Sequence, residues 1–484
     1  MSVAGLKQNG VALAGFAFAA TLLIAMCFTY LRLGAYLDHI EGGVVVSGWE
    51  YAARGTPLYQ LQDGAPRFAT YYGPLAYLVE GLTVFGAGMA VSKLASMTAV
   101  AVTLVIMAKH FADRRGWGAA TDGLFYLAAG MVLFIPQSFW VRPDPFETLL
   151  VAAGVALAAS PIAVGVCIGL AVNFKIHAFV YFFPILIDIM TTRQWRSLVM
   201  VATSAILVFF IPFLMPGIYF RDYFAGLSGQ IGGRAPDARA IVPVLLIALL
   251  LVLPVLCPLT SGHHPARDRM YALAGFAALL FLFYPASIPG AGTYHFLPLV
   301  PILADARTRL RPRGVIARAT VLPLLLPGLM AANMIAGVLG EHHEWGSIAT
   351  DALALAKQSP TPSVQIGYGD SRKSYDIAEL SRAVLTLGGY PAQIDAQILM
   401  ELSPIGIDGS QRWIASLTHC DTKRWLLPKG EKPFALTNFL YGLGPIFDAD
   451  FRRAFLEHYR LTASDRYFDV WDCTATGKTV SGLN

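Results

Sequence analysis

The segment Asp38–Pro74, DHIEGGVVVSGWEYAARGTPLYQLQDGAPRFATYYGP, decides how the rest of the chain is interpreted. It follows an apolar run at 11–33. That run is long enough to cross a bilayer, because a spanning helix needs about 20 apolar residues. Two carboxylates, Asp38 and Glu41, are therefore expected a few residues beyond a membrane helix, at the depth of the lipid headgroups. Acidic side chains at this depth mark the segment as a candidate functional loop.

Composition places the whole chain in a membrane. Of its 484 residues 56% are hydrophobic and 14% are charged, and the mean hydropathy is +0.56. A soluble protein has about 25% charged residues, so an integral membrane protein is indicated. The formal net charge of +5 is modest, and Lys and Arg cluster between apolar runs, which is typical of membrane topology. We expect membrane lipid as a partner, no nucleic acid, and a retained first helix rather than a cleaved signal peptide.

Apolar runs recur along the chain and predict a polytopic α-helical membrane protein with about eleven transmembrane helices. The predicted spans are 11–33, 91–110, 119–137, 145–160, 161–177, 178–192, 197–215, 241–259, 271–288, 293–305 and 315–338. A further apolar stretch, Pro74–Met89, is interrupted by glycines and is expected as a juxtamembrane helix within an external loop at 34–90.

Basic residues predict the orientation. They fall between spans in clusters that one registration puts on a single side: Lys7; Lys109, Arg114 and Arg115; Arg193 and Arg196; Arg267 and Arg269; and Arg307, Arg309, Arg311, Arg313 and Arg318. The positive-inside rule makes that side cytoplasmic. We therefore expect a multi-pass protein of the bacterial inner membrane with a cytoplasmic N-terminus. Its first loop, the turn at Arg142 and the tail after residue 338 are expected in the periplasm.

The tail differs from the rest in character. Residues 1–339 are predicted to form the membrane domain, and residues 340–484 a C-terminal periplasmic domain of the α+β type, with strands near 364–369 and 467–471 and helices near 375–387 and 448–459. Its two cysteines, Cys420 and Cys473, are the ones outside the apolar runs. In an oxidising compartment they are expected to form a disulfide.

Several short motifs follow one another in a definite order. The acidic pair is followed by a small-residue stretch ending in Gly55-Thr56-Pro57-Leu58-Tyr59 and by Tyr72-Gly73-Pro74-Leu75; later come Arg142-Pro143-Asp144, a glycine-rich helix from Gly165 to Lys175, and Tyr294-His295-Phe296-Leu297-Pro298. In this order they resemble the GT-C class of membrane glycosyltransferases, the superfamily of the protein mannosyltransferases and the lipid A aminoarabinose transferase. Those enzymes move a sugar from a polyprenyl phosphate to an acceptor. The chain departs from their adjacent Asp-Glu pair, because two residues separate Asp38 from Glu41.

The resemblance implies an inverting hexosyl or pentosyl transferase that uses a polyprenyl-phosphate sugar as donor. The leaving phosphate is already a stabilised anion, so the reaction needs one carboxylate to take the acceptor proton and cations to hold the phosphate. Asp38 or Glu41 is the expected base. The expected substrate-binding residues are Arg54, Tyr71, Tyr72, Arg142, Asp144, Lys175, His177 and His295.

Each of these residues also has a structural interpretation. Asp-x-x-Glu at the start of a helix is a capping box, which is compatible with a base because capping favours an ionised Asp. Arg142 is placed to pair with Asp144, and Lys175 to extend towards the headgroups. A lone His such as His295 at the start of an apolar helix is commonly a hydrogen-bonded core residue.

The sequence gives fewer indications about cofactors and about alternative functions. The histidine pairs at 263–264 and 342–343 lack further ligands at the usual spacing, so we expect no metal site and no cofactor beyond the lipid-linked donor, although a divalent metal is not excluded. The alternatives are an O-antigen polymerase or ligase and a lipid-linked sugar transporter or flippase. A transporter predicts paired half-repeats, and none is visible. The sequence identifies neither the sugar nor the acceptor.

Overall fold

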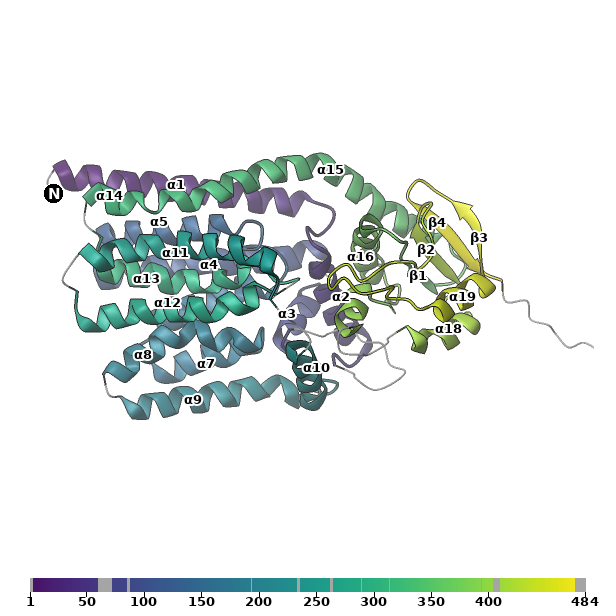
Figure 1. The fold of residues 1–484 in the computed structure, drawn as a ribbon, viewed down its shortest axis with the longest axis horizontal. Helices are drawn as coiled ribbons and strands as arrows, with labels where there is room; N and C mark the ends of the chain where they lie inside the picture. The colour runs from purple at the N-terminus through teal and green to yellow at the C-terminus, as the bar shows by residue number, and fades with distance from the viewer. Residues whose placement is uncertain are drawn as a thin grey trace, which may run out of the picture. The chain divides into compact units, whose positions relative to one another are not determined.

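The computed structural model describes residues 3–59, 72–84, 88–192, 194–232, 236–261, 264–288, 290–312, 314–392, 394–403 and 410–474. The chain divides into two compact units, whose elements are labelled in Figure 1. The first unit comprises Met1–Leu33, Tyr71–Ile218 and Arg234–Gly340, and the second comprises Gly34–Thr70, Tyr219–Gly233 and Glu341–Asn484. The boundary between Gly340 and Glu341 lies close to the predicted one, where the sequence changes from apolar to polar. The first loop differs from the predicted division, because Gly34–Thr70 groups with the C-terminal unit and not with the membrane domain.

The first unit is built from helices that run beside one another (Figure 1). In chain order they are α1 (Val3–Arg32), α3 (Pro74–Val84), α4 (Met89–Arg115), α5 (Trp117–Leu133), α6 (Pro143–Ala156), α7 (Pro161–Val172), η1 (Ile176–Phe182), α8 (Phe183–Thr191), α9 (Trp195–Phe210), η2 (Ile211–Leu214), α11 (Ala238–Ser261), α12 (Ala266–Ala286), η3 (Thr293–Leu299), α13 (Val300–Leu310), α14 (Gly314–Ala319), η4 (Leu322–Leu324) and α15 (Leu325–Lys357), which continues past the division at Gly340.

Five helices in the described part of the chain are long and apolar enough to cross a membrane: Gly10–Arg32, Met89–Arg115, Trp195–Leu214, Ala238–Thr260 and Ala266–Ala286. Pro161–Val172, Ile176–Thr191 and Ala317–Ala331 are shorter apolar helices. The mostly helical chain is thus a polytopic membrane protein. Each of the other predicted spans also contains helix, and the total of eleven crossings stays a prediction.

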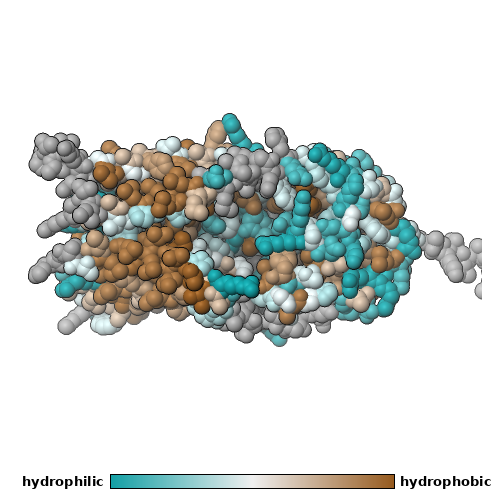
Figure 2. Space-filling model, turned by 45° about the horizontal axis from the view of Figure 1, so that its top comes forward, coloured by the Kyte–Doolittle hydropathy of each residue, from teal (hydrophilic) through white to brown (hydrophobic). Residues whose placement is uncertain are grey.

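On the face shown in Figure 2, apolar side chains gather over the helices of the first unit. In α9 only Val201 is fully buried, while Val199 and Leu207 are each 65% exposed. A continuous apolar surface of this kind is unfavourable in water and is expected where a protein meets lipid. The helix is therefore oriented with most of its side chains towards the hydrocarbon.

Glycines allow the helix that precedes Lys175 to pack closely. A Cβ on Gly165 would lie 1.9 Å from Oγ of Ser204, and one on Gly169 would lie 2.5 Å from the carbonyl oxygen of Ala205. Both contacts are with α9, so a larger side chain would force α7 away from its neighbour. The glycine-rich run thus sets the position of the C-terminal end of α7.

The second unit combines helices with one sheet. Its elements are α2 (His39–Arg54), α10 (Phe220–Gly232), β1 (Val364–Ile366), α16 (Arg372–Leu387), α17 (Ala396–Leu402), η6 (Gln411–Trp413), α18 (Ile414–Thr418), β2 (Arg424–Pro428), α19 (Ala449–His458), β3 (Tyr459–Ser464) and β4 (Phe468–Cys473). The strand order is β1-β2-β4-β3, with β1 parallel to β2 and the other pairs antiparallel. The strand β3, exposed along most of its length, was not predicted.

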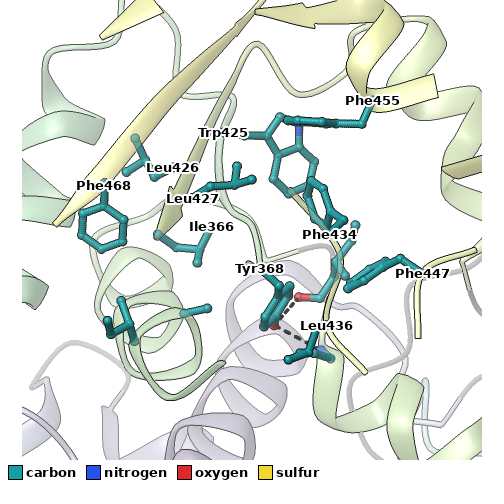
Figure 3. Packing of buried hydrophobic residues seen from close by; sticks show 14 of the residues in the cluster. Ile366, Tyr368, Trp425, Leu426, Leu427, Phe434, Leu436, Phe447, Phe455 and Phe468 are labelled. Atoms are coloured by element: carbon teal, nitrogen blue, oxygen red, sulfur yellow. Dashed lines mark hydrogen bonds between the residues drawn. The ribbon is translucent and has the colours of Figure 1, made fainter. Parts of the chain in front are cut away.

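Aromatic side chains fill the core of this unit (Figure 3). Trp425 on β2 packs edge-on against Phe434 at 5.4 Å between ring centroids, and Phe434 contacts Phe455 of α19 at 4.9 Å. Below them the Tyr368 hydroxyl donates to Oε1 of Glu379 at 2.6 Å. A buried tyrosine hydroxyl needs such a partner, so the apolar core ends at a polar layer on α16.

Cys420 and Cys473 are joined by a disulfide, the pairing expected from the sequence, with a Cα–Cα distance of 6.0 Å and a separation of 53 residues. It ties the turn before β2 to the end of β4. The free cysteines, Cys27, Cys167 and Cys257, all lie in the first unit.

Candidate active site

The N-terminus of α6 places charged side chains inside the first unit. Arg142 is the extended N-cap residue and Pro143 is the first helical residue, where a missing N–H costs no hydrogen bond. Asp144 and Glu147 follow three residues apart, so they share one face of the helix. Both are fully buried, and Arg142 is 2% exposed. The start of this helix therefore places a cation and two carboxylates close together.

Lys175 brings a second cation to the same place. It follows α7 and is 3% exposed, with Nζ 2.5 Å from Oδ1 of Asp144 and 3.6 Å from Oε2 of Glu147. Phe174 stacks on Phe146 of α6 with 5.4 Å between ring centroids, which holds the end of α7 against α6. The alternative in which Lys175 extends to the headgroups is wrong, because its ammonium is paired inside the unit.

Arg142 and Asp144 are also close, with 3.8 Å between Nε and Oδ2. This distance is an ion pair but not a hydrogen bond. Among the described residues, Oδ2 of Asp144 and both carboxylate oxygens of Glu147 accept no hydrogen bond. Buried carboxylate oxygens are normally hydrogen-bonded, so this arrangement is incompletely satisfied.

Aromatic rings surround the two cations. The guanidinium carbon of Arg142 lies 4.0 Å from the ring centroid of Trp140 and 4.5 Å from that of Tyr294. Nζ of Lys175 lies 5.2 Å from the Tyr294 ring and 5.7 Å from the Tyr72 ring. Rings at these distances favour a cation without neutralising it, so the groups that balance the charge of Arg142 and Lys175 are the neighbouring carboxylates.

Two histidines face each other next to this cluster. Nδ1 of His295 is 3.1 Å from Nε2 of His177, and the ring centroids are 4.9 Å apart. The Tyr181 hydroxyl donates to the carbonyl oxygen of His295 at 2.9 Å and so fixes the start of η3. One ring of such a pair donates and the other accepts, and each ring keeps a second nitrogen for another partner.

Tyr72 reaches the cluster through a tight backbone contact. The amide of Gly73 donates to the carbonyl oxygen of Phe174 at 2.9 Å. A Cβ on Gly73 would lie 2.2 Å from the carbonyl oxygen of Asn173, so this position accepts only glycine. Gly73 of the Tyr-Gly-Pro-Leu motif thus allows the chain to pass beside the end of α7. Tyr71, the other predicted aromatic residue, lies outside the described residues.

The predicted base candidates lie in the second unit, where they cap α2. Asp38 is the N-cap and accepts from the amide of Ile40 at 3.0 Å. Oε1 of Glu41 accepts from the amides of Leu37 and Asp38 at 2.8 and 2.9 Å. Glu41 is fully buried, whereas the Asp38 side chain is 19% exposed. The capping box is therefore present, and Asp38 is the more accessible of the two carboxylates.

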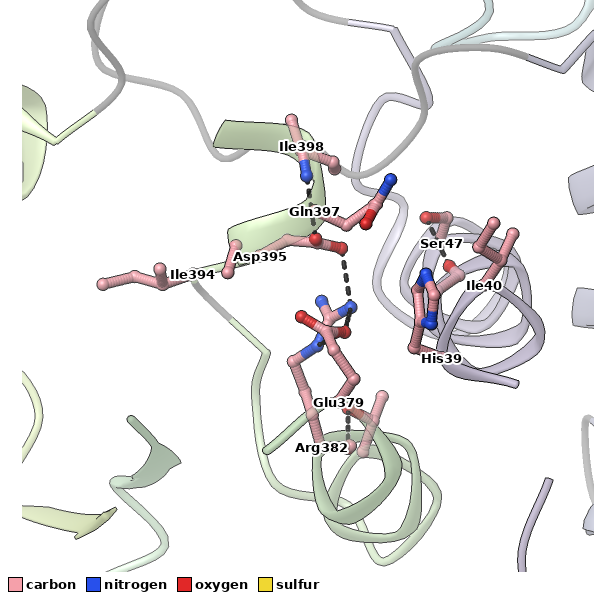
Figure 4. A network of polar contacts seen from close by, with 12 residues as sticks. His39, Ile40, Ser47, Glu379, Arg382, Ile394, Asp395, Gln397 and Ile398 are labelled. Carbon is pink, nitrogen blue, oxygen red and sulfur yellow. Dashed lines mark hydrogen bonds and ion pairs between the residues drawn. The ribbon is translucent and has the colours of Figure 1, made fainter. Parts of the chain in front are cut away.

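His39 lies between this cap and a network on α16 (Figure 4). Its Nδ1 is 2.9 Å from Oδ1 of Asp38. Burial acts to lower the pKa of His39, but the charge and hydrogen bond of Asp38, with Asp376 and Glu379, outweigh it and raise that pKa above its ordinary value. His39 is therefore favoured in its charged form beside the Asp38 carboxylate.

Arg54, at the other end of α2, was predicted to bind substrate. Its Nη2 donates to the carbonyl oxygen of Gly389 at 3.0 Å, and its Nε is 3.5 Å from Oε2 of Glu50. Glu50 in turn accepts from the amide of Ala392 at 3.1 Å. These contacts attach α2 to the segment after α16, and a role in substrate binding stays a prediction.

The first unit thus brings Tyr72, Arg142, Asp144, Lys175, His177 and His295 together from four separate stretches of sequence. Sequence reasoning missed Glu147, Trp140 and Tyr294. Glu147 was recognisable from its spacing, because it lies one turn after Asp144 on a helix that starts with proline. Tyr294 precedes His295 directly, and only the folded chain shows its ring between the two cations.

Chemically, this cluster is suited to a phosphate. Two cations that share buried carboxylates present a net charge close to neutral, with donors that can turn towards an incoming anion. The described residues contain no group of three or more His, Cys, Asp or Glu arranged for a metal ion. His263 and the side chains of His342 and His343 lie outside the described residues, so the expectation of no metal site stays a prediction.

The helical unit that carries this cluster is that of a polytopic membrane protein, and its fold can be compared with solved structures. The chain is similar to the crystal structure of ArnT from Cupriavidus metallidurans bound to undecaprenyl phosphate, with a TM-score of 0.60 and 14% sequence identity over 97% of this chain and 99% of that one. It is also similar to ArnT from the same organism in the apo state, with a TM-score of 0.56 and 13% identity over 96% and 97% of the two chains. No protein-family model and no curated protein matches the sequence. The resemblance predicted from the motifs therefore holds at the level of the fold.

Proposed function

We propose that this protein is an inverting glycosyltransferase that moves a hexose or pentose from a polyprenyl phosphate to an acceptor of the cell envelope, at the periplasmic face of the inner membrane. The observation that carries the proposal is the buried pair of Arg142 and Lys175, ringed by Tyr72, Trp140 and Tyr294. This cluster occurs in a fold whose solved relative binds undecaprenyl phosphate.

The proposed reaction is a single displacement. An acceptor oxygen attacks the anomeric carbon of the donor sugar, and its proton passes to a carboxylate of the protein. The bond between the anomeric carbon and the phosphate oxygen breaks, and the polyprenyl phosphate leaves with the electron pair. Attack from the face opposite to the leaving group inverts the anomeric configuration.

Arg142 and Lys175 are assigned to the donor phosphate, because charge grows on its oxygens as the bond breaks. Of His177 and His295, the ring that accepts in their mutual contact keeps an N–H on its other nitrogen, and this ring is assigned to the same phosphate as a hydrogen-bond donor. Tyr72 is assigned to the sugar pocket, together with Tyr71. Asp144 and Glu147 orient Lys175 and keep its charge inside the unit.

Asp38 is the preferred base. Glu41 is fully buried and uses Oε1 to accept two backbone amides, whereas Asp38 is partly exposed and lies 2.9 Å from Nδ1 of His39. The C-terminal part of the second unit is assigned to presenting the acceptor.

The decisive experiment is transfer of label from a panel of radiolabelled polyprenyl-phosphate sugars into membranes that contain the full chain. Asp38→Asn is the informative variant, because Asn is as good an N-cap as Asp and leaves α2 intact while it removes the basic carboxylate. We expect transfer to fall by at least about a hundredfold, the usual contribution of a general base, with unchanged insertion and thermal stability.

Glu41→Gln is the matched control, because a glutamine at this position also completes a capping box. We expect it to transfer at near the wild-type rate. If both variants keep full activity, the base does not lie at the start of this helix. If Glu41→Gln is inactive while Asp38→Asn is active, Glu41 is the base and Asp38 is not. A panel in which no polyprenyl-phosphate sugar is used by the wild type contradicts the proposed donor class.

A further inference from the structure

A second polar cavity, of about 600 Å³, lies within the first unit at the other end of its helices from the cluster around Lys175. The course of α6 shows the separation: Asp144 begins the helix in the cluster, and Val155 lines the cavity three turns later, about 16 Å along the axis. The volume lies in the range of pockets that hold small molecules or headgroups. None of its lining residues belongs to the proposed transfer site.

Three aspartates of the cavity wall are already paired with neighbours. Arg309 has Nε 2.8 Å from Asp305 and Nη1 3.3 Å from Asp188 and 3.8 Å from Asp268. Arg267 forms a two-point pair with Asp188, at 2.5 and 3.0 Å. His110 lies 3.1 Å from Oδ1 of Asp305. These contacts join three carboxylates, two guanidiniums and one imidazole in a single network.

Two further arginines, Arg114 and Arg115 at the end of α4, also line the cavity. The ion pairs that the described residues form here include neither of them. Nε of Arg115 is buried and donates no hydrogen bond to a described residue. With them, the cavity lining contains four arginines and three aspartates, so it keeps an excess of positive charge that favours an anion.

The lining also includes an apolar wall, formed by Val155, Ile185 and Ile189. Near it in sequence, Leu157 is 46% exposed and Ile162 is 53% exposed, as expected for side chains that contact acyl chains. A free anion from water gains nothing from such apolar side chains. A phosphate attached to an acyl glycerol has groups for both the cations and the apolar side chains.

We propose that this cavity binds the phosphate of an anionic phospholipid, with Arg114 and Arg115 as its cationic ligands and with the glycerol and first acyl carbons against the apolar wall. Basic pockets between membrane helices on the cytoplasmic side are favourable places for anionic headgroups. The basic clusters put this end of the helices on that side. The proposal goes beyond sugar transfer and does not depend on it.

The test is a titration of the purified full chain with phosphatidylglycerol, read by native mass spectrometry, with phosphatidylcholine as the zwitterionic reference. Arg114→Gln/Arg115→Gln is compared with Arg269→Gln, a matched control on α12 that is exposed at the same end but does not line the cavity. We expect the double variant to bind phosphatidylglycerol about thirtyfold more weakly, from the typical contribution of two basic side chains near an anionic surface. The control is expected to bind as the wild type does.

The remaining outcomes separate the sources of the anion. Competition by inorganic phosphate or glycerol 3-phosphate at concentrations similar to those of the lipid assigns the cavity to a free phosphate and overturns the lipid proposal. The site itself is overturned if the wild type and the double variant bind the lipid equally well. It is also overturned if Arg269→Gln loses as much lipid binding as the double variant. If the double variant does not fold, the exposed Arg114→Gln alone is used, with an expected loss of about fivefold.

Discussion

Each unit of this protein buries a cation between two carboxylates, with different completeness. In the second unit, Arg382 donates from Nε and Nη2 to Oε2 of Glu379 at 3.2 and 2.6 Å and from Nη2 to Oδ2 of Asp395 at 2.6 Å (Figure 4). In the first unit, Lys175 lies 2.5 Å from Asp144 and 3.6 Å from Glu147, whose two oxygens accept no hydrogen bond from a described residue.

This difference in hydrogen bonding indicates a different role for each cluster. A buried charge is retained at low cost only when its hydrogen bonds are made, as they largely are around Arg382. Asp395 also caps α17 by accepting from the amide of Ile398 at 3.0 Å, so the network joins elements of the fold. The cluster around Lys175 leaves carboxylate capacity unused, which destabilises the folded state. Such a cost is expected where a site is kept ready for a ligand.

The largest expected effect is that of Lys175→Met. This variant leaves Asp144 and Glu147 buried without their nearest cation, so we expect a loss of about 3–5 kcal/mol in the free energy of unfolding together with a loss of transfer. The amount of inserted protein, its thermal unfolding and label transfer measure both.

A double variant separates the two consequences. Lys175→Met/Asp144→Asn removes one charge of each sign, so we expect much of the stability to return while transfer stays absent. Recovery of transfer in the double variant contradicts the assignment of Lys175 to the donor phosphate.

Arg382→Met tests the structural side of the comparison. Removing this guanidinium leaves Glu379 and Asp395 buried without a cation, at an expected cost of about 3–5 kcal/mol in the stability of the second unit. Limited proteolysis and hydrogen exchange of the full chain locate the loss. Transfer by the molecules that remain folded should keep its KM for the donor; a specific rise in that KM argues against a purely structural network.

The surface pair of Arg453 and Asp450 supplies the control for this variant. Its side chains are 65% and 55% exposed, so Arg453→Gln is expected to change stability by no more than about 1 kcal/mol. If Arg453→Gln lowers the stability as much as Arg382→Met does, burial does not explain the contribution of the Arg382 network to stability.

The disulfide gives a smaller effect that is confined to the second unit. Cys420→Ser/Cys473→Ser opens a loop with a separation of 53 residues, and the chain-entropy model predicts a loss of about 3–4 kcal/mol. We expect the thermal transition of the second unit to move downwards while that of the first unit, whose three cysteines are free, stays in place. A shift of both transitions shows that the two units unfold together.

The smallest expected effect is a pH dependence from His39. Its pKa is raised in the folded chain, chiefly by Asp38 against the opposing effect of burial. The stabilisation is therefore complete below the ordinary pKa of histidine, about 6.5, and is lost as pH rises through the higher folded value. The unfolding midpoint of the second unit should decline across this window in the wild type and remain flatter in His39→Gln. If the unfolding midpoint changes with pH in the same way in the wild type and in His39→Gln, other groups cause the pH dependence.

Part of the site could be predicted because its residues stand out locally. Arg142, Lys175 and His295 are polar residues next to long apolar runs. Such residues are costly to place in a membrane, so their presence indicates a function. Their partners could not be predicted in the same way. Lys175 meets Asp144 at a separation of 31 residues and His295 meets His177 at 118, and both contacts depend on how the helices pack.

The sequence by itself determined that this chain is a polytopic membrane protein and in which order its polar motifs occur, because membrane-length hydropathy and basic clusters are properties of short segments. It also indicated the fold class, which the likeness to ArnT supports. Only the tertiary structure decided that α2, from the first loop, packs with α16 of the C-terminal region, and that Glu147 and Tyr294 lie close to Lys175. These contacts join residues distant in sequence, and packing of whole helices, rather than any local preference, brings them within reach of one another.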